Sequence, residues 1–231
     1  MMDNPWAELP AKPPYVLPGD RESLTTLNNR ASAGGRADCR INEASIPEPF
    51  IGSTKSATVI LLNLNPGDSD DDRKAHENPA FRDAMIRNLR HEEQEYPFYP
   101  LNPAFAWTAC AKWWTQHLHE LFDRGKLSPE AVAQRLCVIE WFPYHSPKAK
   151  CLPDTRICPS QEYSFGLAKR ILGTNRLIIG MRARRRWAKV EPLLGKVGYL
   201  RSAQNPAISV GNVGDSLFWR IVTALRNGNL R

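Results

Sequence analysis

Short apolar segments alternate with longer amphipathic ones from residue 58 onward, and this alternation constrains the fold most strongly. The apolar segments span residues 58–64, 136–142, 176–180 and about 198–203. Short apolar runs bounded by turn residues are typical of buried strands. The intervening segments predict helices over 78–95, 104–123, 128–136, 160–172, 182–189 and 215–227. Strands separated by helices predict an α/β fold, a three-layer sandwich with a central, mainly parallel sheet and helices on both faces.

One α/β domain accounts for this pattern, and we assign it residues 51–231. Residues 1–50 are rich in proline, glycine and small polar residues, which predicts an extended arm, most flexible over 28–39. The chain shows no export signal and no apolar run near the roughly 20 residues that cross a bilayer. We therefore expect a cytoplasmic protein without a membrane partner.

The charge balance favours an anionic partner, because the formal net charge is +7 and the pI is near 9.3. A dense run of positive charge occupies residues 182–189, where an aromatic residue, Trp187, lies among Arg182, Arg184, Arg185, Arg186 and Lys189. Arginines interleaved with an aromatic ring suit a phosphate backbone with an unstacked base nearby. A solvated helix face is the alternative interpretation of the same run.

Five cysteines are scattered without a C-x-x-C pair, which argues against a zinc ribbon or an iron–sulfur cluster. They are Cys39, Cys110, Cys137, Cys151 and Cys158. A metal site formed by Cys151, Cys158 and His145 is an alternative, but structural roles are the expectation. We predict no metal and no other cofactor.

Three loops follow predicted strands, after Leu64, Phe142 and Ala203. In open parallel sheets ligands bind beyond the carboxyl ends of the strands. The first loop carries Asn65-Pro66-Gly67, the second carries the sequence PYHSPK, and the third carries Asn205-Pro206. These loops are therefore the candidate functional segments.

Taken together, the three loops resemble those of the uracil-DNA glycosylase superfamily over residues 55–228. The sequence LNLNPG resembles the G-x-N-P-G motif of the mismatch-specific and single-strand-selective branches, with Asn63 in place of the first glycine. The segments VIEWF-PYHSPK and NPAISVGNVG resemble the base-gripping and minor-groove loops. The resemblance implies a monomeric DNA glycosylase that flips a damaged or modified base and hydrolyses its N-glycosidic bond.

The resemblance places Asn65 at the water-positioning position, and the chemistry of the side chain agrees. An amide holds water well because its oxygen accepts and its nitrogen donates hydrogen bonds. Pro66 would rigidify the loop and Gly67 would allow close approach of the base. Asp68 is a second catalytic candidate, as a stronger water activator. The alternatives are an Asx turn at Asn65, and a solvated loop, helix start or divalent-ion site at residues 68–72.

Base recognition is assigned to residues around the second loop. Glu140 occupies the place of an asparagine in uracil-specific members, and an ionised carboxylate there would repel a carbonyl and favour an amino-bearing base. An alignment slip or an arginine partner behind the site is the alternative. Phe142, Tyr144 and His145 are the candidates that sandwich or polarise the base, ahead of His76 and Phe81. The Trp113-Trp114 pair is assigned to the core.

The third loop is assigned to the DNA duplex. Asn205 and Pro206 would press on the minor groove, Ser209 would contact phosphate, and Ile208 or Val210 would wedge into the space of the flipped base. A simple Asn-Pro turn is the alternative. Two other functions remain open: a nucleic-acid- or nucleotide-binding protein that has lost cleavage, and a hydrolase of free nucleosides.

Overall fold

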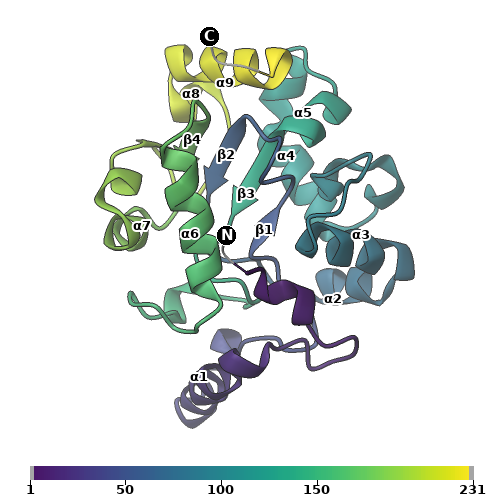
Figure 1. The fold of residues 1–231 in the computed structure, drawn as a ribbon, viewed down its shortest axis with the longest axis vertical. Helices are drawn as coiled ribbons and strands as arrows, with labels where there is room; N and C mark the ends of the chain where they lie inside the picture. Colours follow the sequence, from purple (N-terminus) through teal and green to yellow (C-terminus); the bar gives the residue numbers. More distant parts are fainter. Residues whose placement is uncertain (1–2, 229–231) are drawn as a thin grey trace.

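A five-stranded sheet with the order β1-β3-β2-β4-β5 lies at the centre of the computed structural model, which describes residues 3–228 (Figure 1). Its strands are β1 (Phe50–Ile51), β2 (Val59–Leu62), β3 (Leu136–Ile139), β4 (Leu177–Gly180) and β5 (Gly198–Tyr199). Strands β3, β2, β4 and β5 pair in parallel, whereas β1 pairs antiparallel with β3. The prediction of a mixed α/β fold with a mainly parallel sheet is confirmed. The two-residue edge strand β1 was not predicted.

Helices flank the sheet on two sides (Figure 1). One side carries α6 (Gln161–Leu172) and α7 (Arg184–Val190), and the other carries α2 (Asp70–Glu77), α3 (Pro79–Leu89) and α4 (Ala109–Asp123). The remaining helices of the domain are α5 (Pro129–Arg135), α8 (Val210–Val213) and α9 (Asp215–Asn227). Helix α9 covers the amino ends of the strands, where the Thr58 hydroxyl donates to the Ala224 carbonyl at 2.8 Å. Within residues 3–228, no helix combines the length and apolar character needed to cross a membrane.

Short 3-10 turns connect these elements. They are η1 (Pro5–Glu8), η2 (Pro18–Asp20), η3 (Ala37–Cys39), η4 (Tyr99–Leu101), η5 (Pro103–Phe105), η6 (Ala149–Cys151) and η7 (Pro192–Gly195). Proline occupies an early position of η1, η2, η4, η5 and η7, where its fixed φ favours the turn and its missing N–H costs nothing.

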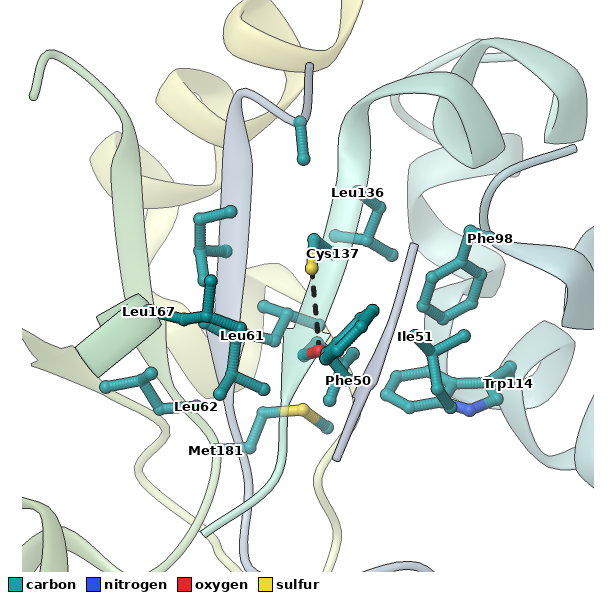
Figure 2. Close-up of a cluster of buried hydrophobic side chains, with 14 of the residues drawn as sticks. Phe50, Ile51, Leu61, Leu62, Phe98, Trp114, Leu136, Cys137, Leu167 and Met181 are labelled. Carbon is teal, nitrogen blue, oxygen red and sulfur yellow. Dashed lines mark hydrogen bonds between the residues drawn. The ribbon is translucent and has the colours of Figure 1, made fainter. Parts of the chain in front are cut away.

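The core is built on the three central strands, in which every residue is buried. Figure 2 shows Leu61 and Leu62 of β2 with Leu167 of α6 on one side and Trp114 of α4 on the other. Burial on both faces explains why these strands are continuously apolar rather than alternating. A rigid central sheet therefore fixes where its carboxyl-terminal loops emerge.

Several helix boundaries differ from the prediction for local reasons. The acidic run begins helix α2, because Ser69 and Asp72 form a reciprocal capping box at its amino end. This is the helix-start alternative, not the solvated loop. Helix α3 ends at Leu89 rather than at residue 95, and His91 beyond it has a left-handed φ of 57°. Helix α4 begins at residue 109 rather than 104, because Thr108 is its N-cap.

The segment 1–50 is not extended throughout, contrary to the prediction. Residues Arg21–Ala33 form helix α1, which overlaps the segment expected to be most flexible. Figure 1 places α1 beyond the carboxyl ends of the strands, opposite α9. Trp6 and Leu24 are buried and belong to the main core cluster. The arm is therefore a packed layer over the carboxyl edge of the sheet.

The cysteines also depart from expectation. Cys39 of the arm and Cys151 of the second loop form a disulfide, whereas Cys110, Cys137 and Cys158 are free. Cys151 is thus committed to the arm and not to a metal site with Cys158. Within residues 3–228, no group of three His, Cys, Asp or Glu side chains is placed to hold a metal ion.

Candidate functional site

A cavity of about 400 Å³ lies at the carboxyl edge of the sheet. Its wall comes from Glu48 and Ile51, from residues between 63 and 81, from α4, from Glu140 and residues between 145 and 149, and from Arg182. The parallel pairing of β2, β3 and β4 brings the loops that follow them to one edge. The volume falls in the range of small-molecule binding sites. Two of the three loops expected at this edge therefore line a common cavity.

The strand register places Asn63 beside Glu140. Leu62 of β2 pairs with Ile139 of β3, so the next residue of each strand continues the same row. The Asn63 amide nitrogen donates to Oε1 of Glu140 at 2.9 Å, and both residues line the cavity. Asn63 Oδ1 and Glu140 Oε2 are buried without a hydrogen-bond partner in the described chain. Asn63, which stands where the motif G-x-N-P-G has its first glycine, is thus part of the cavity wall.

Burial raises the pKa of Glu140 to about 8, the carboxylate of Glu48 acts in the same direction, and Asn63 and Arg182 oppose the shift. At neutral pH the side chain is therefore mainly a neutral carboxylic acid. An ionised carboxylate that repels carbonyl groups, as expected from the sequence, is therefore not the main form at neutral pH. A protonated Glu140 donates through one oxygen and accepts through the other.

The amide of Asn65 is fixed in one orientation on the cavity wall. Its nitrogen donates to the Pro66 carbonyl at 2.8 Å and to Oγ of Ser146 at 2.9 Å. A carbonyl only accepts hydrogen bonds, so the nitrogen must face it and Oδ1 remains as the acceptor. Pro66, Gly67 and Ser146 also line the cavity. This arrangement suits a water molecule held through Oδ1.

Asp68 also lines the cavity, but its oxygens are engaged elsewhere. Oδ1 accepts from the Asn42 amide at 2.7 Å, and Oδ2 pairs with the Arg73 guanidinium at 2.6 Å. Both oxygens of the carboxylate are thus occupied by neighbouring side chains. The structure thus gives Asp68 a role in joining the arm to the start of α2, rather than the catalytic role predicted for it.

The two histidines of the cavity differ in the atoms they offer. His145 places Nδ1 2.6 Å from the Gly67 carbonyl and Nε2 2.9 Å from the Ile46 carbonyl, so both nitrogens are placed to donate to backbone. Its Nε2 also lies 3.7 Å from the Glu48 carboxylate. His76 accepts from the Ile46 N–H through Nδ1 at 3.0 Å, which leaves Nε2 for a ligand. His76, rather than His145, is therefore the histidine that offers a nitrogen to a ligand, which reverses the predicted order.

Burial lowers the pKa of His76 well below its usual value, and nearby His145 and Arg82 add to the effect. The ring is neutral at physiological pH, and because Nδ1 is an acceptor the proton resides on Nε2. His76 thus presents an uncharged N–H donor.

Phe142 and Tyr144 lie in the core and do not line the cavity. The Tyr144 hydroxyl donates to Oδ2 of Asp20 at 2.6 Å and accepts from the Leu17 N–H, so it anchors the arm. Their predicted contact with a base is wrong for this structure. Phe81 and Trp113 are the aromatic side chains that line the cavity together with Trp114. The assignment of the tryptophan pair to the core holds for Trp114, which is also buried.

The basic segment divides into exposed and packed residues. Trp187 is completely buried and cannot stack on a base, contrary to the prediction. Arg186 donates to Asp154 and to the Leu152 carbonyl, so it braces the second loop. Arg184 donates to the Gly195 carbonyl.

The remaining basic residues offer charge near the cavity or to solvent. Arg182 lines the cavity and donates to the Ala203 carbonyl at 3.1 Å, which ties the third loop to β4. Arg185 is exposed. Lys189 is also exposed and donates to the Asp154 carbonyl at 3.1 Å. Arg182 and Arg185 are therefore the residues of this segment that best fit an anionic partner.

The third loop is more packed than expected. Ile208 is buried and donates its N–H to the His117 carbonyl, so it is not available as a wedge. Pro206 is buried, and the Ser209 hydroxyl caps helix α8. Asn205 is exposed, and Val210 is half-buried. Of the predicted DNA contacts in this loop, Asn205 is the one whose side chain faces solvent.

The cavity includes residues that were missed as site candidates. Glu48 comes from the arm, Cys110 from α4, and Asn63 and Ser146 from the first two loops. Ser146 lies inside the motif PYHSPK and could have been found as its next polar residue. Glu48 had no comparable signal, because its position depends on how the arm folds.

Comparison with protein-family models, curated proteins and solved structures finds no match to this chain.

Proposed function

We propose that the protein is a DNA glycosylase-like hydrolase that receives a flipped nucleobase in the cavity at the carboxyl edge of the sheet. Water held by Asn65 would attack the anomeric carbon, the glycosidic electron pair would leave with the base, and the departing base would take up the proton that the water releases. The observation that carries the proposal is the locked amide of Asn65, whose oxygen is the remaining acceptor beside a base-sized cavity. No general base is required of the amide, because its task is to position water.

The departing base accumulates negative charge, which fixed donors stabilise best when they need not reorient. The neutral N–H of His76 is such a donor, and its tautomer is set by the backbone N–H of Ile46. The Ser146 hydroxyl accepts from Asn65 and retains its own proton for donation. These groups give the cavity donors beside the acceptor that holds water.

The rim of the cavity supplies positive charge through Arg182. Arg185 and Lys189 extend that charge along helix α7, and Asn205 is exposed on the neighbouring loop. Phosphates of a DNA strand would contact these side chains while the base enters the cavity. A polyanion is favoured over a free nucleoside, because the basic residues extend beyond the cavity.

A binding protein without cleavage is the second candidate. The observation in its favour is that both oxygens of Asp68, the second catalytic candidate, are bonded to Asn42 and Arg73. Under this alternative, the cavity would hold a base or nucleotide and Asn65 would contribute a hydrogen bond but no reaction.

An oligonucleotide cleavage assay separates the two candidates. Labelled strands that carry uracil, hypoxanthine, xanthine or a modified cytosine are incubated with the full-length protein and then treated with hot alkali. We expect strand scission at one base, and its loss in Asn65→Ala. Asn29→Ala is the matched control, because Asn29 is an exposed asparagine of α1.

Binding without scission at any base would overturn catalysis and favour the binding protein. Retention of full activity in Asn65→Ala would overturn the assigned role of its amide. Salt titration completes the test, because contacts with phosphates weaken steeply as salt rises.

A further inference from the structure

Two side-chain oxygens without partners meet in the cavity wall. Asn63 Oδ1 and Glu140 Oε2 are the two oxygens among the buried side-chain atoms that lack a hydrogen-bond partner in residues 3–228. Asn63 and Glu140 are 5% and 2% exposed, and both line the cavity. Native structures rarely leave buried polar atoms unpaired. Two such atoms, on residues that are hydrogen-bonded to each other, indicate a ligand that supplies the missing partners.

The hydrogen bond between the two residues assigns their roles. Asn63 donates its amide hydrogen to Oε1 of Glu140, so Asn63 Oδ1 is an acceptor for the ligand. With Oε1 occupied as an acceptor, the proton of a neutral Glu140 resides on Oε2. Oε2 then donates to the ligand. The wall thus offers one acceptor beside one donor.

The backbone holds this pair in place. The Asn63 N–H donates to the Ile139 carbonyl at 3.0 Å, and the Asn63 carbonyl accepts from the Trp187 indole at 2.8 Å. The Glu140 N–H donates to the Pro49 carbonyl at 2.9 Å. Both residues are therefore held on the sheet rather than on a loose loop, which favours discrimination between ligands.

We infer that Asn63 and a proton-carrying Glu140 read the edge of a heterocyclic base that presents one N–H donor beside one acceptor atom. This inference rests on the proposed function only in taking the cavity as a base site. The ring N–H donates a hydrogen bond to Asn63 Oδ1. The neighbouring ring or exocyclic acceptor accepts a hydrogen bond from the protonated Oε2 of Glu140. If Glu140 were ionised, Asn63 Oδ1 and Glu140 Oε2 would both be acceptors, and the pair could not match such an edge.

Recognition therefore depends on pH through Glu140. Burial raises its pKa to about 8, so the reading form is present below that pH and is lost above it. The titratable or charged groups that face Glu140 come from the arm, η4, α4 and the loop after β4. They are Glu48, Tyr99, Cys110 and Arg182.

Glu140→Gln tests the inference, because glutamine keeps the acceptor for Asn63 and carries a permanent N–H donor in place of the proton. Binding of free uracil to the full-length protein is measured by calorimetry at about pH 6.5 and about pH 9. We expect the wild-type affinity to fall roughly tenfold between them, as the competent fraction falls. Glu140→Gln should lose this dependence, while ionisation of uracil itself affects both proteins equally. Glu130→Gln, an exposed glutamate of α5, should behave as the wild type.

Uracil methylated at N3 is the second probe, because it lacks the N–H that Asn63 accepts. We expect at least roughly tenfold weaker binding than uracil, the loss of one good hydrogen bond. Equal binding of both probes, persistence of the pH dependence in Glu140→Gln, or no binding of uracil at any pH would overturn the inference. None of these outcomes depends on strand scission, so the proposed function is judged separately by the oligonucleotide assay.

Discussion

The indole Nε1 of Trp187 donates a hydrogen bond to the backbone carbonyl of Asn63 at 2.8 Å. Trp187 lies in the helix that carries the basic residues, and Asn63 lies at the cavity wall. The aromatic residue expected to meet a base thus supports the residue that faces the cavity. The basic helix and the site are joined by this bond as well as by packing.

Replacing Trp187 by phenylalanine should destabilise the protein by about 1–3 kcal/mol, because a buried carbonyl loses its donor and the smaller ring leaves a void. Urea unfolding measures the change. Trp219→Phe is the control, since Trp219 is 40% exposed and should shift the free energy of unfolding by about 0.5 kcal/mol or less. Equal effects of the two substitutions would contradict a structural role for the bond.

Under the proposed function, Arg185→Gln and Arg186→Gln should separate DNA binding from folding. Arg185 is exposed, so its neutralisation should leave stability unchanged. It should reduce the slope of the logarithm of the DNA-binding constant against the logarithm of salt concentration by about one, the loss of one phosphate contact. Arg186 braces residues 152–154 and should lower stability when neutralised. Binding measured over a salt series, with thermal unfolding beside it, checks both. Loss of stability in Arg185→Gln would contradict the division.

Glu140 should contribute a fall in the free energy of unfolding as pH rises from about 5 to about 8, by up to roughly 1.4 kcal/mol per pH unit, whereas the lowered pKa of His76 acts in the opposite direction below about pH 6.5. The folded state keeps the proton on Glu140 up to its pKa of about 8, whereas the unfolded chain releases it near the ordinary value of 4.5. The raised pKa of Glu48, also caused by burial, acts with the same sign.

Chemical denaturation over this pH range measures the slope in wild type and in Glu140→Gln. The substitution should remove the contribution of Glu140 from the slope and leave the contribution of Glu48. An unchanged slope would show that Glu140 ionises normally in the folded protein.

Thiol titration in denaturant should count three free cysteines without reductant and five with it, because Cys39 and Cys151 are bonded. Reduction should lower the free energy of unfolding by about 2–5 kcal/mol, as expected for a long closed loop. A Cys39→Ser, Cys151→Ser double variant should match the reduced protein. Five reactive thiols before reduction would contradict the disulfide.

The central sheet was predictable because burial on both faces leaves an uninterrupted apolar run. Strands β2, β3 and β4 each lie inside a segment predicted from that signal. Strand β1 has two residues and pairs with a partner 89 positions away, Phe50 with Ile139, so no local pattern predicts it. The arm was misjudged for a related reason, since the packing of Trp6 and Leu24 against the domain stabilises it.

The site was predictable where residues follow a strand directly. Asn65 and Glu140 lie at the cavity because the ends of parallel strands share an edge. Phe142 and Tyr144 were misplaced, because the direction of a side chain beyond a strand depends on its tertiary partners. For Tyr144 that partner is Asp20, 124 residues earlier in the chain. Glu48 was missed for the same reason.

The pairing of Leu62 with Ile139 also bears on how such a site changes over generations. Asn63 and Glu140 are neighbours by strand alignment, so one inserted or deleted residue in either strand would turn a side chain to the opposite face and separate them. Point substitutions leave the alignment intact. Under the inferred base reading, exchanging these two side chains would change the hydrogen-bonding groups of the cavity wall with no loop rebuilt, whereas a change in strand length would separate them.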